Sequence, residues 1–208
     1  MARLIALGAV LALAASGCGG GKKYSAPRAP RPATDAAPWP APPKPLQLAR
    51  RAGLTPETHE FLLYHVHAHL DVFVDGRAVP VPAGIGINID DPGVHLFREP
   101  DGTIGYGGIS PPCKTPCISP LHTHDDFGVL HTESKISRPN TLGQFFTEWG
   151  VRLDPSCVGG YCKPRDPIAI FVDGKHYTGN PADIALTDKK EIAIVIGSPP
   201  SSIPSKFP

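Results

Sequence analysis

The chain has 208 residues, with 20 Lys or Arg against 19 Asp or Glu, and a formal net charge of +1 at pH 7. This balance gives no indication of a nucleic-acid-binding protein, which carries a strongly basic face. The length allows one domain that buries its own core, together with terminal segments outside that domain.

Residues 1–17 have the layout of a signal peptide. Arg3 precedes an apolar run from Leu4 to Ala15, and small residues then lead to Cys18. A run of about a dozen residues is too short to cross roughly 30 Å of hydrocarbon as a helix. The layout resembles the signal of bacterial lipoproteins, whose first mature residue is an acylated cysteine. We therefore expect export, lipidation of Cys18, and a protein anchored to the periplasmic or cell-surface side of a membrane.

Residues 18–54 are rich in Pro and Ala and contain few large apolar side chains. Such a composition favours an extended tether over a packed core. Residues 19–51 contain seven Lys or Arg against Asp35 alone, whereas the chain from residue 52 onward has an excess of acidic residues. We expect a basic tether, attracted to anionic lipid headgroups, that carries an acidic domain. The domain is predicted at residues 55–200, followed by a flexible tail at residues 201–208.

The domain has the pattern of a mainly β protein of the α+β class. Residues 62–74 alternate between apolar and largely polar positions, which is typical of a half-buried strand. Asp-Gly pairs, which favour tight hairpin turns, recur between apolar stretches. They are found at Asp75-Gly76, Asp101-Gly102 and Asp173-Gly174. The sequence predicts an antiparallel sheet or sandwich of short strands and hairpins.

One helix is predicted at residues 141–149. Thr141 and Gln144 form a capping-box pattern, and Gly150 is a typical helix end. Leu142, Phe145, Phe146 and Trp149 fall at helical spacing. A stripe of this size predicts a helix that packs against the sheet as core.

Six of the nine histidines fall into two short segments. In the first, His65, His67 and His69 are spaced by two residues. A strand places such residues on one face about 7 Å apart, whereas a helix would scatter them.

The second segment is residues 120–134, where Asp125-Asp-Phe-Gly128 indicates a four-residue turn between two short strands. This turn sets His124 opposite Val129 and His122 opposite His131. Cross-strand neighbours have Cβ atoms about 5 Å apart. The hairpin therefore predicts three imidazoles on one face, with Glu133 nearby.

Crowded neutral imidazoles can each offer a ring nitrogen to a metal ion at about 2.0–2.1 Å. Nitrogen-rich ligation suits copper or zinc. Asp125 or Glu133 could complete the coordination or orient a histidine. The predicted site comprises His122, His124 and His131, together with ligands from the strand histidines His65, His67 and His69.

Two other functions remain open at this point. A metal-dependent enzyme, either a cupin-like oxygenase or a zinc hydrolase, would need an open coordination position on the ion. A metal-free interaction module would use the histidine face to bind a partner. Ligands of one zinc ion lie within about 4 Å of each other, so ring nitrogens more than about 5 Å apart would favour the metal-free module.

Several motifs follow one another along the domain. They are His65-Val-His-Ala-His-Leu70, Phe73-Val-Asp-Gly76, Val81-Pro-Ala-Gly-Ile-Gly86, the run from His122 to Glu133, and Thr141-Leu-Gly-Gln-Phe-Phe-Thr-Glu-Trp-Gly150. In this order they resemble a family of exported bacterial and archaeal proteins, over roughly residues 62–197. The resemblance implies a coherent domain with a shared histidine constellation and names no reaction.

Four cysteines remain besides Cys18, and the chain departs from that family in carrying them. They are Cys113, Cys117, Cys157 and Cys162. An even number of cysteines in an exported protein predicts two disulfides, for which three pairings exist. Alternatively, Cys113 and Cys117 could serve as thiolate ligands beside the histidines.

Overall fold

The computed structural model describes residues 31–98 and 100–208. The helical segments in this part of the chain are α1 (Pro45–Arg51), α2 (Leu142–Trp149) and the 3-10 turn η1 (Pro181–Asp183). The longer strands are β1 (Tyr64–Val74), β6 (Val129–Ser134), β9 (Ile168–Val172) and β11 (Lys190–Ile196). The shorter strands are β2 (Arg77–Val79), β3 (His95–Arg98), β4 (Ile104–Gly107), β5 (Leu121–His122), β7 (Cys157–Val158), β8 (Tyr161–Cys162) and β10 (Lys175–Tyr177).

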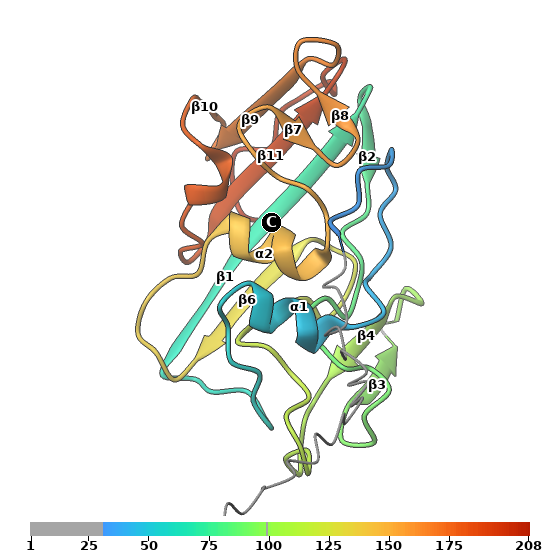
Figure 1. The fold of residues 1–208 in the computed structure, drawn as a ribbon, viewed down its shortest axis with the longest axis vertical. Helices are drawn as coiled ribbons and strands as arrows, with labels where there is room; N and C mark the ends of the chain where they lie inside the picture. The colour runs from blue at the N-terminus through green and yellow to red at the C-terminus, as the bar shows by residue number, and fades with distance from the viewer. Residues whose placement is uncertain (1–30, 99) are drawn as a thin grey trace, which may run out of the picture.

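The described residues form a central seven-stranded sheet in the order β10-β9-β11-β1-β6-β5, with β2 also paired to β1 (Figure 1). The mainly β fold with one nearby helix is therefore confirmed. The two central strands, β1 and β11, run parallel, from Ala68 opposite Lys190 to Val74 opposite Ile196. A parallel pair joins segments far apart in the chain and has no local turn signal, so the expectation of an antiparallel sheet missed it.

Strand β1 alternates as the sequence predicted. Ala68, Leu70 and Val72 are buried in the main core, and the histidines take the other face. The strand turns into β2 through Asp75 and Gly76, which have φ values of 48° and 75°. Positive φ at both central residues is what a type I′ hairpin requires. The predicted turn is therefore confirmed.

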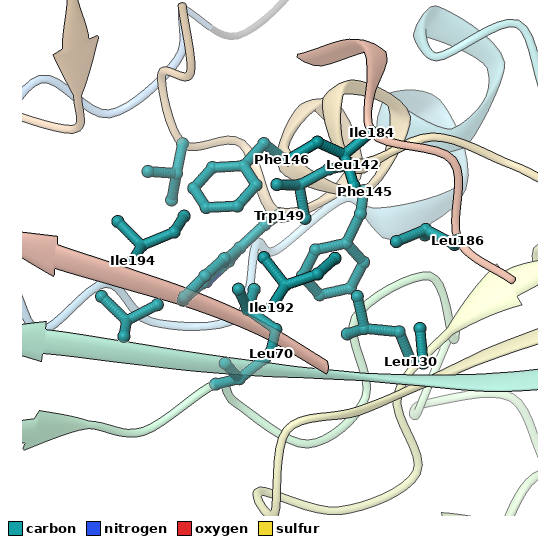
Figure 2. Close-up of a cluster of buried hydrophobic side chains, with 14 of the residues drawn as sticks. Leu70, Leu130, Leu142, Phe145, Phe146, Trp149, Ile184, Leu186, Ile192 and Ile194 are labelled. Carbon is teal, nitrogen blue, oxygen red and sulfur yellow. The ribbon is translucent and has the colours of Figure 1, made fainter. Parts of the chain in front are cut away.

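Helix α2 covers the core face of the sheet, and Figure 2 shows its aromatic side chains above Leu70 and Ile192. The predicted capping box is present, because Thr141 accepts a hydrogen bond from the Gln144 backbone and the Gln144 side chain bonds back to Thr141. Gly150 ends the helix with φ 74°. Burying each large apolar side chain contributes roughly 1.5–3 kcal/mol, so this helix anchors the sheet.

The folded domain begins earlier than the expected boundary at residue 55. Trp39 is only 2 % exposed, and its ring meets that of Trp149 edge-on at 5.6 Å. Helix α1 packs beside α2 and buries Leu48. The prediction of a tether through residue 54 is therefore wrong for residues 31–54. The average composition of this proline-rich segment did not indicate that Trp39 is buried or that α1 forms a short helix.

The two ends of the chain differ in what the structure describes. The predicted signal peptide, residues 1–17, and the lipidation site Cys18 lie outside the described residues. At the other end, Phe207 lies 6.2 Å from the His69 ring, so the expected flexible tail lies against the sheet. Neither helix among residues 31–208 is both long and apolar enough to span a membrane.

Both predicted disulfides are present, and each joins near neighbours in the sequence. Cys113 bonds to Cys117 and Cys157 bonds to Cys162. The first bridge lies in a small second core with Ile87, Ile109 and Ile118, and the second links β7 to β8. Because its sulfurs are bonded to each other, the first pair does not supply the thiolate ligands of the alternative prediction.

Candidate metal centre

The strand register brings the two histidine segments onto one face of the sheet. In the ladder between β1 and β6, His67 lies opposite His131 and His65 lies opposite Glu133. In the ladder between β5 and β6, His122 lies opposite His131, as the sequence predicted. Because side chains alternate along a strand, these residues point away from α2 and the main core.

Five side chains from these strands, and His124 from the loop after β5, form two overlapping groups that could hold a metal ion. The outer group is His65, His67, His131 and Glu133, and the inner group is His122, His124, His131 and Glu133. Within each group, one ligand atom from every residue lies within 4.8 Å of all the others. The His65 side chain is 38 % exposed and that of His122 is 0 % exposed, so the outer group opens to solvent and the inner group lies beneath it.

Backbone carbonyls determine which ring nitrogen carries the hydrogen in the inner imidazoles. Nδ1 of His122 lies 2.9 Å from the Ser119 carbonyl oxygen, and Nδ1 of His124 lies 2.5 Å from that of Tyr106. A carbonyl oxygen only accepts, so each Nδ1 carries a hydrogen and donates it. In the neutral rings both Nε2 atoms then present lone pairs, and these atoms are 3.2 Å apart. Two lone pairs at this distance repel each other unless a cation lies between them.

The spacing of the ligand atoms fits tetrahedral coordination. Nitrogen ligands at about 2.0–2.1 Å from a zinc ion are separated by about 3.3 Å along each edge of the tetrahedron. The Nε2 atoms of His122 and His124 are 3.2 Å apart, and those of His65 and His67 are 3.1 Å apart. Nε2 of His65 is 3.2 Å from Oε1 of Glu133. Each group therefore contains at least one pair at the edge length of a metal site.

Two buried atoms of the shared residues are unpaired. His131 Nδ1 and Glu133 Oε2 have no hydrogen-bond partner within the described part of the chain. Nδ1 of His131 is 3.6 Å from Oε1 of Glu133, and Oε2 of Glu133 is 4.0 Å from Nε2 of His122, both beyond hydrogen-bond length. Leaving a buried polar atom unpaired costs roughly 1–3 kcal/mol, so a bound cation would relieve both atoms.

The electrostatics favour the protonation state that binds metals. Burial lowers the pKa of His122 well below its ordinary value, and the neighbouring imidazoles lower it further. Burial also lowers the pKa of His131 and that of His67. Burial opposes ionisation of Glu133, but the surrounding imidazoles outweigh it, and the pKa of this carboxyl is lowered overall. Neutral imidazoles therefore surround an ionised carboxylate.

Glu60, in the loop before β1, is a further carboxylate at the cluster. Burial raises its pKa and the charge of Glu133 raises it further, whereas His124 and His65 lower it. These interactions put Glu60 within electrostatic reach of both groups. Sequence reasoning missed it because it belongs to neither histidine motif, and closeness to His65 in the chain was the only available signal.

His69 shares the strand face but does not join the six residues. Its Nδ1 is 2.9 Å from Oε2 of Glu191, and its Nε2 is 2.7 Å from the Phe127 carbonyl oxygen. Burial alone would lower its pKa, but the hydrogen bond and charge of Glu191 raise it overall. Both ring nitrogens are thus engaged, and His69 ties β1 to β11 and to the loop before β6. With Asp71 and Glu191 it forms a third, separate group whose geometry could hold a metal ion.

The loop between β5 and β6 is longer than the sequence suggested. The ladder stops at His122 opposite His131, so residues 123–128 form the loop rather than residues 125–128 alone. The predicted pairing of His124 with Val129 is therefore wrong, and the carbonyl in β4 positions the His124 ring instead. The difference arises because Thr123 bonds to the backbone of residues 82 and 85, a long-range contact that draws the loop away from the ladder.

Asp125, a predicted ligand or supporting carboxylate, lies outside both groups. It accepts a hydrogen bond of 3.0 Å from the Phe127 backbone and shapes the loop. The three isolated histidines also lie outside the groups. His59 packs on Phe61 at 4.2 Å between ring centroids, and His95 and His176 belong to β3 and β10.

Comparison of the chain with protein-family models, with curated proteins and with solved structures gives no match. The function of the centre therefore has to be argued from its own geometry and chemistry.

Proposed function

We propose that this protein binds a transition-metal ion, copper or zinc, through His122, His124 and His131. The observation that carries the proposal is the 3.2 Å contact between two Nε2 atoms whose rings both donate Nδ1–H to backbone carbonyls. Histidines that ligate metals nearly always donate the other ring N–H in this way. A shared proton could also bridge two such nitrogens, but burial disfavours a charged His122.

The donor set limits the choice of ion. Three imidazoles with one carboxylate suit the borderline ions copper and zinc, whereas magnesium and calcium prefer oxygen donors. Copper binds such sites more tightly at equilibrium, so the ion bound in a cell depends on supply as well as on affinity.

We also propose that the domain works outside the cytoplasm, tethered to a membrane. The support is the lipoprotein-like N-terminus ending at Cys18, together with the two disulfides, which persist in oxidising compartments. In this setting a neutral-histidine site would meet metal ions before they reach the cytoplasm.

A metal-dependent hydrolase is the second candidate, and Glu60 favours it. A hydrolytic metal site needs an open position for water and a nearby carboxylate that takes its proton. The partly exposed His65 side of the cluster provides access, and Glu60 interacts electrostatically with His65, His124 and Glu133 of the cluster. A cupin-like oxygenase fits less well, because the sheet ends at β10 and β5 instead of closing into a barrel.

A metal-free interaction module is disfavoured by the distances. One pair of Nε2 atoms in each group lies 3.1 or 3.2 Å apart, within the distance of about 4 Å that separates ligands of one zinc ion. All ligand atoms of each group lie within 4.8 Å of one another.

Calorimetric titration of the chelator-treated protein with zinc or copper at pH 7.5 tests metal binding. The variant His122→Ala/His124→Ala should lose the tightest equivalent of metal, with affinity falling at least tenfold. The matched control, His59→Ala/His176→Ala, removes two histidines outside the cluster and should titrate as the parent does. If the first variant binds with unchanged stoichiometry and affinity, the proposal is wrong.

A further inference from the structure

We infer that the histidine face holds two metal ions, bridged by the carboxylate of Glu133. This inference rests on the proposed metal binding and specifies its stoichiometry. It starts from the division of the cluster into an inner and an outer group that share only two residues.

Six donors divided in this way do not suit a single ion. Ligands at opposite corners of an octahedron with bonds of about 2.1 Å lie about 4.2 Å apart, whereas the six side chains do not form one group even at a spacing of 4.8 Å. They form two sets of four, each within that spacing, and four is the number of ligands that zinc prefers. Each set has its own close imidazole pair, His65 with His67 and His122 with His124. Two centres therefore account for all six side chains.

Glu133 is oriented to bridge the two centres. Its Oε1 lies 3.2 Å from Nε2 of His65 in the outer group. Its Oε2 lies 4.0 Å from Nε2 of His122 in the inner group, and is buried and unpaired among the described residues. One carboxylate thus directs one oxygen to each centre. Sites with two metals commonly hold the ions about 3.5–4 Å apart, a span that a single carboxylate can bridge.

His131 stands between the two imidazole pairs. Its ring centroid is 4.5 Å from that of His67 and 4.4 Å from that of His124. Because these distances are nearly equal, His131 could ligate the ion of either centre, while Glu133 bridges the two ions.

Local negative charge would offset part of the charge of two divalent ions. Glu133 supplies one carboxylate directly, and Glu60 lies within electrostatic reach of both groups. Asp188 accepts a hydrogen bond from the His67 backbone at 3.4 Å, beside the outer group.

The test is zinc stoichiometry, measured on the full mature chain by dialysis and elemental analysis. The parent should bind two ions per chain. The variant His65→Ala/His67→Ala removes only exposed or half-buried rings and should retain one ion. The variant His122→Ala/His124→Ala should also retain one ion, held by the outer group. Circular dichroism and thermal unfolding would establish that each variant is folded.

Loading with two equivalents of Cu²⁺ gives an independent readout of the bridge. Electron paramagnetic resonance of the parent should show spin coupling between neighbouring ions. Glu133→Gln, which keeps the side-chain volume but has only one oxygen, should abolish the coupling and weaken the second equivalent at least tenfold. Glu57→Gln, at a glutamate that pairs with Lys135 outside the cluster, is the matched control and should retain the coupling.

The outcomes separate the two claims. One ion per chain in the parent, or two uncoupled copper ions, would overturn the bridged centre while leaving metal binding intact. If the parent binds no metal, the proposed function itself fails.

Discussion

The Nε2 atoms of His122 and His124 lie 3.2 Å apart, while each ring donates its opposite N–H to a backbone carbonyl. The carbonyls belong to Ser119 and Tyr106. The protein thus fixes both rings so that their lone pairs converge, and a converging pair of neutral nitrogens is a metal-binding arrangement.

A substitution at Gly107 should disturb this arrangement without removing a ligand. A Cβ atom on Gly107 would lie 2.7 Å from Nδ1 of His124, which would push the ring away from the Tyr106 carbonyl. Changes that disturb the support of a ligating histidine typically cost 10–100-fold in metal affinity. We expect Gly107→Ala to weaken zinc binding by about 10–100-fold in a competition titration with a chelator.

Gly105→Ala is the matched control in the same strand, because its Cβ would clash with the Phe97 ring and would displace that ring instead of His124. It should leave zinc affinity unchanged. Equal losses in both variants would mean that disturbance of β4, not displacement of His124, is responsible.

Metal affinity should resist mild acid. Three imidazoles with an ordinary pKa of about 6.5 would together lose about sixfold in affinity between pH 7.5 and pH 6.5. Because burial lowers the pKa of both His122 and His131, protons compete with the metal only at lower pH. Zinc titrations at pH 7.5, 6.5 and 5.5 should therefore show less than about a sixfold loss at the first step and a steeper loss below it. A full loss of about sixfold by pH 6.5 would indicate that the ligands are solvated, unshifted histidines.

The two disulfides should differ in their effect on the centre. Cys117 lies two residues before Ser119, whose carbonyl holds His122, whereas Cys157–Cys162 closes the separate hairpin of β7 and β8. For loops this short, losing either bridge should cost about 2 kcal/mol of unfolding free energy. We expect Cys113→Ser/Cys117→Ser to weaken zinc binding as well, and Cys157→Ser/Cys162→Ser to leave it unchanged. Denaturant unfolding and zinc titration of both variants check this, and a loss of affinity in the second would refute the assignment.

Glu148 should destabilise the fold at neutral pH. Its side chain on α2 is fully buried, and neither carboxylate oxygen has a hydrogen-bond partner among the described residues. Burial raises its pKa well above the ordinary value, so the folded state binds a proton that the unfolded state releases above about pH 4.5. Stability from this group is present below that pH and is lost as the pH rises toward the folded-state pKa.

Glu148→Leu should therefore be more stable than the parent by about 1–3 kcal/mol at pH 7.5. Its advantage should shrink toward pH 4.5, where the parent carboxyl is protonated in both states. Thermal unfolding of both proteins across this range measures the difference. A constant or inverted difference would contradict a buried, protonated Glu148.

Local patterns predicted much of the fold. The alternation around His65 and His67 identified β1 and its histidine face, and the Thr141 capping box identified α2. The Asp75-Gly76 pair identified a hairpin. These features depend on neighbours in the sequence, so they can be read without the tertiary structure.

Features that depend on distant contacts were not predictable. The parallel pairing of β1 with β11 and the packing of Trp39 on Trp149 join segments about a hundred residues apart. At the centre, the hairpin pattern predicted His122 opposite His131. The strand pattern included His69, which Glu191 and the Phe127 carbonyl engage, and neither pattern indicated Glu60. Only the folded chain shows which ring nitrogens remain free.

Anomalous diffraction at the zinc edge, from crystals of the zinc-loaded protein, tests the central claim most directly. An anomalous peak should lie between Nε2 of His122 and Nε2 of His124, about 2.0–2.1 Å from each, with His131 or Glu133 completing the coordination. A zinc-loaded crystal that shows no peak between these two nitrogens, or peaks only elsewhere on the surface, would contradict it.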